Sequence, residues 1–212
     1  MLTHTSGIVY GSFNPGKLDA LYRKNNIHEG FSHPSLSTEE WINQLATVPL
    51  AHQPGARFSY GLNMDVLGRI IEIASGKKLD AYFYENILEP AEMKDTHFYQ
   101  PAINHERIIP VYMKANGQYI DDETLGLTAF TDYPFSSGRD FFSSGAGLSG
   151  TALDYAFFLQ NLVEGGNDLL SEAAVREMSR DQLPDVLDDI RFNPFQIGND
   201  FCRNDTNQRL SA

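Results

Sequence analysis

The 212-residue sequence predicts an α+β fold that is mostly helical and contains one small β-hairpin. Apolar residues recur at helical spacing in several stretches, and three of these begin with a Ser or Thr that can cap a helix. An Asn-Gly pair between two strand-like runs provides the hairpin signal. The hydrophobic fraction of 42% is enough to build one sizeable core.

Start and stop signals mark several of the predicted helices. Ser37-Thr-Glu-Glu40 has the form of a capping box, and it opens a helix that continues past Trp41 and ends before Pro49. Thr151 caps a later helix that ends at Gly165-Gly166. We expect an apolar face on this later helix made by Tyr155, Phe158, Leu159 and Leu162, and further helices over residues 62–74 (with Gly76 as the stop), 79–88 and 171–178.

Strand signals are confined to the middle of the chain. Residues Ile109–Lys114 and Gln118–Ile120 flank Asn116-Gly117, the pair that favours a two-residue hairpin turn. Periodicity fades from Pro184 onward. We therefore expect one partial domain over residues 1–184, followed by a poorly defined tail, or the interrupted start of a sheet, over residues 185–212.

Charge and composition exclude several classes of function. The formal net charge is −12 and the pI is about 4.8, which argues against nucleic acid or an anionic membrane as a partner. The single cysteine, Cys202, excludes an internal disulfide and a cysteine-based zinc site, and the six histidines lack metal-ligand spacing, so no metal is expected. No glycine loop suited to a phosphate is present, so no cofactor is expected. The sequence leaves the compartment open between cytoplasm and periplasm.

Four stretches in a fixed order carry a family resemblance. The most informative is Val48–Tyr60, which runs into the segment Gly61–Arg69 and has a tyrosine at the point where a loop meets a helix. The chain resembles serine β-lactamase-like hydrolases, specifically the class C β-lactamase-related carboxylesterases of family VIII. The other three matching stretches are Leu2–Gly7 with Tyr10-Gly11 and Asp19–Arg23, Leu88–Thr96, and Ser144–Tyr155.

The resemblance implies a fold and a chemistry. It implies that residues 1–184 are mostly the helical domain of a penicillin-binding-protein-like fold, without much of its α/β domain. It implies acyl transfer from short-chain esters, with β-lactams as a further possibility, through a serine nucleophile on a Ser-x-x-Lys helix turn. Tyr60 matches the family tyrosine that shuttles the serine proton, and Tyr10, Ser144 and Gly145 match positions expected to contact the small-molecule ester.

One departure from the family motif favours esterase ancestry. β-Lactamases usually carry Asn two residues after this tyrosine, whereas this chain has Leu62 there and Asn63 one residue later. An offset of one residue at a helix start redirects a side chain by about 100°. Leu62 thereby removes an amide that could hold a β-lactam side chain.

The expected nucleophile is absent from the sequence. The only Ser-x-x-Lys match is Ser75-Gly-Lys-Lys78, which follows the tyrosine motif and contains a helix-breaking glycine, so we do not assign Ser75 as the nucleophile. The chain is therefore interpreted as an internal piece of a longer hydrolase. A non-catalytic helical binding module, an inactive pseudoenzyme and a non-functional gene fragment remain as alternatives.

Overall fold

The structure is a computed structural model, and it describes residues 1–14, 16–27, 29, 36–110, 112–115, 117–121, 135 and 140–182. The expected tail over 185–212 and Asn116 of the expected turn lie outside these described residues. Among the described residues, no helix combines the length and apolarity needed to cross a membrane.

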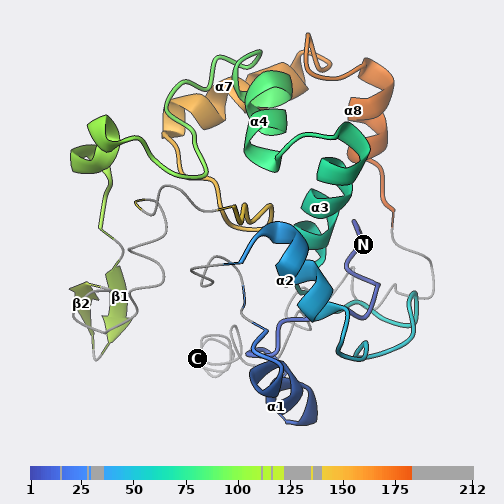
Figure 1. Cartoon of the computed structure of the whole chain (residues 1–212). Coiled ribbons are helices and arrows are strands. Elements are labelled where there is room, and N and C mark those ends of the chain that lie inside the picture. The colour runs from blue at the N-terminus through green and yellow to red at the C-terminus, as the bar shows by residue number, and fades with distance from the viewer. Residues whose placement is uncertain are drawn as a thin grey trace, which may run out of the picture.

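Helices dominate the described part of the chain, and the small hairpin lies apart from them (Figure 1). In chain order the helical elements are α1 (Lys17–Lys24), α2 (Thr38–Leu45), α3 (Asn63–Ser75), α4 (Leu79–Phe83), the π-helical turn η1 (Tyr84–Leu88), the 3₁₀ helix η2 (Ala102–Arg107), α7 (Ala152–Val163) and α8 (Glu172–Met178).

The helices with clear caps lie where the sequence places them. Ser37 and Glu40 form the complete capping box of α2, because each side chain bonds the other residue's backbone N–H. Gly76 ends α3 in the left-handed conformation, at φ 68°, and Thr151 and Ser171 each accept a backbone hydrogen bond at the start of α7 and α8. The predicted helix over residues 79–88 is one α-helical segment that continues into a π-helical turn.

Two helical elements have no counterpart in the sequence prediction. The helix α1 begins at Gly16, whose missing side chain cannot cap it, and η2 has no side-chain cap either. Tyr22 of α1 is buried in the core, so tertiary packing stabilises this short helix where local signals are weak.

The predicted hairpin is present with a slightly shifted first strand. Strand β1 (Tyr112–Ala115) pairs antiparallel with β2 (Gln118–Asp121), and the pairing of Ala115 with Gln118 leaves a two-residue loop. Gly117 has φ 80°, as the two-residue turn requires.

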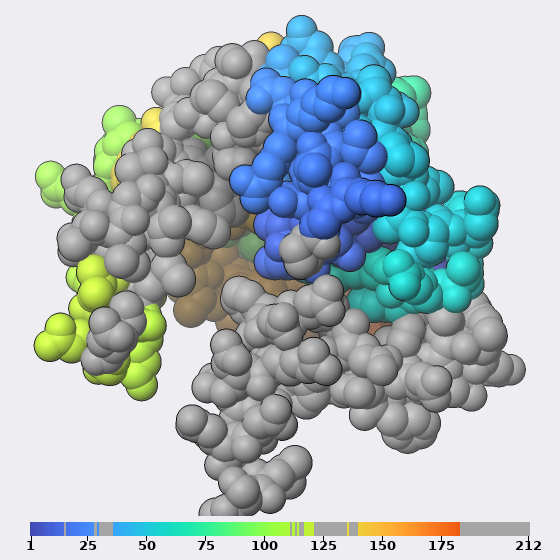
Figure 2. Space-filling model, turned by 90° about the horizontal axis from the view of Figure 1, so that it is seen from below, coloured from blue at the N-terminus to red at the C-terminus, as the bar shows by residue number. Residues whose placement is uncertain are grey.

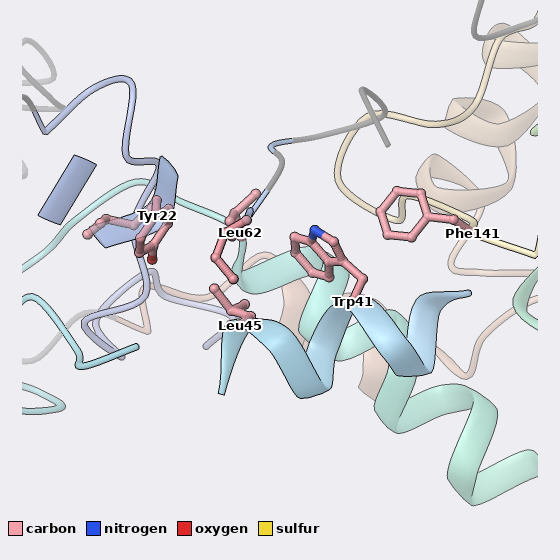
Figure 3. Packing of buried hydrophobic residues seen from close by; sticks show 7 residues of the cluster. Tyr22, Trp41, Leu45, Leu62 and Phe141 are labelled. Carbon is pink, nitrogen blue, oxygen red and sulfur yellow. The ribbon is translucent and has the colours of Figure 1, made fainter. Parts of the chain in front are cut away.

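The main core lies between the N-terminal segment, α2 and the start of α3. Figure 3 shows Trp41 and Leu45 of α2 pointing toward Leu62, with Phe141 beyond the indole and Tyr22 on the opposite side. The rings of Trp41 and Phe141 meet edge to face at 5.4 Å. This core therefore joins residues separated by more than a hundred positions in the sequence.

Candidate active site around Tyr60

Tyr60 stands at the end of a loop that leads into α3. The next residue, Gly61, packs directly on the N-terminal segment: a Cβ atom there would lie 2.3 Å from the Cα of Val9. Leu62 follows and is fully buried in the main core. The backbone is thus fixed immediately after Tyr60, while the Tyr60 side chain remains 39% exposed.

Three rings from the N-terminal segment surround the Tyr60 ring, and we call these four residues the aromatic cluster. The centroid of Tyr60 lies 5.0 Å from His4, 5.4 Å from Tyr10 and 6.5 Å from Phe13. Phe13 is stacked nearly parallel to Tyr60, with 21° between the ring planes. The structure therefore brings together two of the sequence-assigned site residues, Tyr10 and Tyr60.

Tyr10 keeps its proton in this environment. Burial of the ring raises the pKa of the Tyr10 phenol far above its ordinary value, and the charges of Asp65, Tyr60 and Glu29 raise it further. A phenol that stays neutral is a hydrogen-bond donor. Tyr10 can therefore donate to a ligand oxygen next to Tyr60.

His4 is a site residue that sequence reasoning missed. Its backbone is in the left-handed region, at φ 52°, where residues other than glycine are uncommon and often functional. The side-chain amide of Asn63 donates to His4 Nδ1 at 3.1 Å, which leaves the proton of the neutral ring on Nε2. Burial, and then the charge of the N-terminal amino group, lower the pKa of His4 and favour the neutral ring. Its spacing to other histidines gives no metal-binding signal, and the only sequence signal for it is its place within the Leu2–Gly7 stretch.

Asn63 holds the N-terminal segment against α3. Its side-chain oxygen accepts a hydrogen bond from the Ser6 hydroxyl, and its amide also donates to the Ile8 carbonyl at 3.2 Å. Asn63 is fully buried, and its side chain bonds the N-terminal segment. Its role in the structure is therefore to position His4 and the chain that leads to Tyr10.

Ser144 and Gly145 contact the first turn of α3. The Ser144 hydroxyl donates to the carbonyl of Met64 at 2.6 Å, and the Gly145 N–H donates to Asp65 Oδ1 at 3.3 Å. Asp65 is buried, and this burial raises the pKa of its carboxyl group, against the opposing effect of the hydrogen bond from the Ser143 hydroxyl. The structure thus brings Ser144 and Gly145 against the first turn of α3, where the Ser144 hydroxyl is already engaged.

The Ser-x-x-Lys match does not form a catalytic pair. Ser75 is the last residue of α3, and the left-handed Gly76 separates it from Lys78 at the start of α4. The Lys78 ammonium instead forms an ion pair with Asp140. The continuous helix turn that would place the amine beside the hydroxyl is absent here. Among the described residues, no group of three or more His, Cys, Asp or Glu side chains could hold a metal ion.

Comparison with known proteins assigns the family. A family model described as beta-lactamase matches residues 1–207. The chain belongs to the β-lactamase family. Protein Rv1367c of Mycobacterium tuberculosis is 32% identical over 210 residues, which are 96% of this chain and 49% of that protein. Lovastatin esterase of Penicillium rubens is 28% identical over 185 residues, which are 86% of this chain and 43% of the esterase. The chain thus spans about half the length of the curated relatives it matches.

Solved structures agree on the fold. EstCE1, a hydrolase with promiscuous acyltransferase activity, superposes with a TM-score of 0.70 at 24% identity, over 82% of this chain and 47% of its own. Unliganded simvastatin synthase LovD from Aspergillus terreus gives a TM-score of 0.67 at 25% identity, over 91% of this chain and 43% of the synthase. A penicillin-binding protein from Bacillus halodurans gives a TM-score of 0.58 at 19% identity, over 85% of this chain and 49% of that protein. The expected β-lactamase and penicillin-binding-protein-like fold is therefore confirmed, as part of that fold.

Proposed function

We propose that this chain provides the tyrosine side of a serine-hydrolase site that transfers acyl groups from short-chain esters to water. The observation that carries the proposal is the partly exposed phenol of Tyr60, held beside Tyr10 on a backbone fixed by Gly61. The relatives named as an esterase and as a hydrolase with acyltransferase activity support this chemistry. In the same proposal, residues 1–184 correspond mostly to the helical part of the fold.

Each site residue has a role in this reaction. A serine hydroxyl attacks the ester carbonyl while Tyr60 accepts its proton, and Tyr60 returns the proton to the departing alcohol. Water then attacks the acyl-serine ester and releases the acid. Tyr10 donates a hydrogen bond to the ester, and the backbone around Ser144 and Gly145 lies beside the acyl group. The ester is a small molecule, and β-lactams are a secondary substrate class.

A second function follows from the missing nucleophile. Ser75 and Lys78 are separated by Gly76, so the Ser-x-x-Lys match within these 212 residues cannot act as the helical pair. If no other serine and lysine complete the site, the chain is a helical module that binds small molecules without turnover.

The experiment begins with the reading frame around the Met1 codon. The protein that this frame encodes is purified and assayed with p-nitrophenyl butyrate and with nitrocefin, as the wild type and as Tyr60→Phe. Because general acid–base catalysis contributes about 10²–10⁴-fold, we expect Tyr60→Phe to lower kcat/KM for the ester by that factor. Tyr155→Phe is the matched control, since Tyr155 lies exposed on α7, and it should leave turnover unchanged.

Two results would contradict the proposal. Full esterase turnover in Tyr60→Phe would show that Tyr60 has no catalytic role. A frame without Ser-x-x-Lys, together with a folded protein that hydrolyses neither substrate, would favour the binding module.

A further inference from the structure

Most cations in the described part of this acidic chain are used in ion pairs. The net charge is −12, and the described salt bridges engage Arg23, Arg69, Lys77, Lys78, Lys94, Arg107, Arg176 and Arg180. Lys17 and Arg57 are among the exceptions, because neither forms an ion pair with any described residue. An unpaired cation attracts anions, and two in one place attract them more strongly.

Lys17 and Arg57 line the same cavity. It has a volume of about 400 Å³, and no carboxylate is among its described lining residues. The cavity is shallow and open to solvent, and its other described lining residues are Asn14 and five apolar residues, Leu18, Leu21, Pro49, Leu50 and Ala51. Two cations beside apolar side chains fit a molecule with a carboxylate at one end and a hydrocarbon body.

Asn14 links this cavity to the segment that carries the aromatic cluster. Asn14 follows Phe13, which stacks on Tyr60, and the Asn14 amide donates to the carbonyl of Tyr10 at 2.8 Å. Arg57 lies three residues before Tyr60 on the same loop. Figure 2 shows the N-terminal residues in blue side by side with cyan residues of the segment that follows α2. A backbone hydrogen bond from the Gly55 N–H to the Thr5 carbonyl joins the two segments.

We propose that the cavity lined by Lys17 and Arg57 binds the carboxylate of an amphiphilic substrate. The preferred esters then carry a free carboxylate away from the scissile bond, and their apolar part lies against Leu18, Leu21 and Leu50. As a substrate subsite this inference rests on the proposed function, whereas the binding of the anion can be measured without any turnover.

The test measures binding of sodium octanoate to the 212-residue chain by isothermal titration calorimetry. Octanamide, which has the same hydrocarbon body without the charge, is the matched ligand. We expect octanoate to bind more tightly than octanamide, and we expect its affinity to fall when NaCl is raised from 50 to 500 mM. Lys17→Gln and Arg57→Gln should each weaken octanoate binding about two- to fivefold, the factor for one exposed ion pair, with little effect on octanamide.

Lys24→Gln is the matched control, because Lys24 is also an exposed cation of α1 without an ion pair to a described residue but does not line the cavity. It should bind octanoate like the wild type, and circular dichroism should show that all three variants are folded. Equal affinity for octanoate and octanamide would overturn the proposal. Octanoate binding that Lys24→Gln weakens as much as Lys17→Gln would also overturn it, because attraction by net charge alone would then explain the data. An inactive enzyme in which octanoate binding still depends on Lys17 and Arg57 would refute only the proposed reaction.

Discussion

The starts of α3 and α7 share one feature but differ in their surroundings. Each helix has a buried carboxylate in its first turn that holds a distant segment of the chain. Asp65 of α3 accepts hydrogen bonds from the Ser143 hydroxyl and the Gly145 N–H. Asp154 of α7 accepts from the Asp95 N–H at 2.9 Å and from the Thr96 hydroxyl at 2.7 Å.

The two helices differ in what surrounds them beyond this first turn. Leu62 and Asn63 at the start of α3 are fully buried, whereas Tyr155 and Val163 of α7 are 59% and 86% exposed. Of the apolar face predicted for α7, Phe158 packs against the cluster that includes Leu88, while Tyr155 and Leu159 are exposed. The comparison shows that a carboxylate anchor holds one end of a helix, whereas close packing at Gly61, Leu62 and Asn63 also fixes the loop that carries Tyr60.

The largest effect is expected from crowding the start of α3. In Gly61→Ala the new Cβ would lie 2.3–2.6 Å from the backbone of Ile8 and Val9, which cannot move without breaking the contact with α3. We expect a loss of at least about 3 kcal/mol in the free energy of unfolding, measured by urea denaturation. Gly55→Ala is the control on the same loop: its Cβ meets no atom within 4 Å, and only its positive φ costs stability, about 1 kcal/mol. Equal losses in the two variants would show that Gly61 and Val9 are not in close contact.

The two anchoring carboxylates should respond differently to substitution and to pH. The pKa of the Asp65 carboxyl group is higher in the folded protein than in the unfolded chain. As the pH falls, the folded protein therefore takes up a proton at Asp65 before the unfolded chain does. The contribution of Asp65 to the free energy of unfolding therefore increases as the pH falls through the raised pKa, and it is fully present below the unfolded value near 3.8. The same contribution is lost as the pH rises through the raised pKa. At pH 7 we expect Asp65→Asn to be close to neutral, within about 1 kcal/mol, because it removes a buried charge.

Lowering the pH should reveal the difference between wild type and Asp65→Asn. Urea unfolding at pH 7 and pH 5 should show the wild type gaining stability relative to Asp65→Asn at the lower pH. Asp154→Asn is the comparison, and we expect it to cost about 2 kcal/mol at pH 7 because it weakens two hydrogen bonds to a charged acceptor. A wild type that loses stability relative to Asp65→Asn between pH 7 and pH 5 would contradict the raised pKa.

The smallest effect is expected on the outer face of α7. Val163→Ala shortens a side chain that is already exposed, so no cavity forms and little apolar area is lost. We expect a change within about 0.5 kcal/mol in the free energy of unfolding. A loss above 1 kcal/mol would mean that this face of α7 is covered in the protein in solution.

The sequence predicted the helices that have a clear apolar period or a local start or stop signal, and it missed α1 and η2. The capping box at Ser37 and the stop at Gly76 are local interactions, so they can be recognised from a few adjacent residues. The helix α1 has neither signal, and its Tyr22 is buried against residues far along the chain. Local chemistry therefore sets the start of α2 and the end of α3, whereas packing decides whether α1 forms.

The residues of the candidate site also fall into two groups, those that a sequence motif identifies and those that only contacts between distant residues reveal. The family resemblance placed Tyr10 and Tyr60 in one site, and their rings are in contact. It did not identify His4, because the contact of His4 with Tyr60 depends on a strained backbone and on the bond from Asn63. The sequence shows that Asn63 is offset by one residue from the family position, but it does not show what Asn63 binds. Its partners lie more than fifty residues earlier in the chain.

The family, the helices with local start or stop signals, the hairpin turn and the tyrosine at the loop before α3 can all be recognised in the amino-acid sequence. These features depend on residues that are neighbours in the chain, or on motifs in a fixed order. The buried side of α7, the rings around Tyr60 and the cavity shared by Lys17 and Arg57 depend instead on how the chain folds. Burial and unpaired charge are properties of groups brought together from distant positions, and no local pattern specifies them.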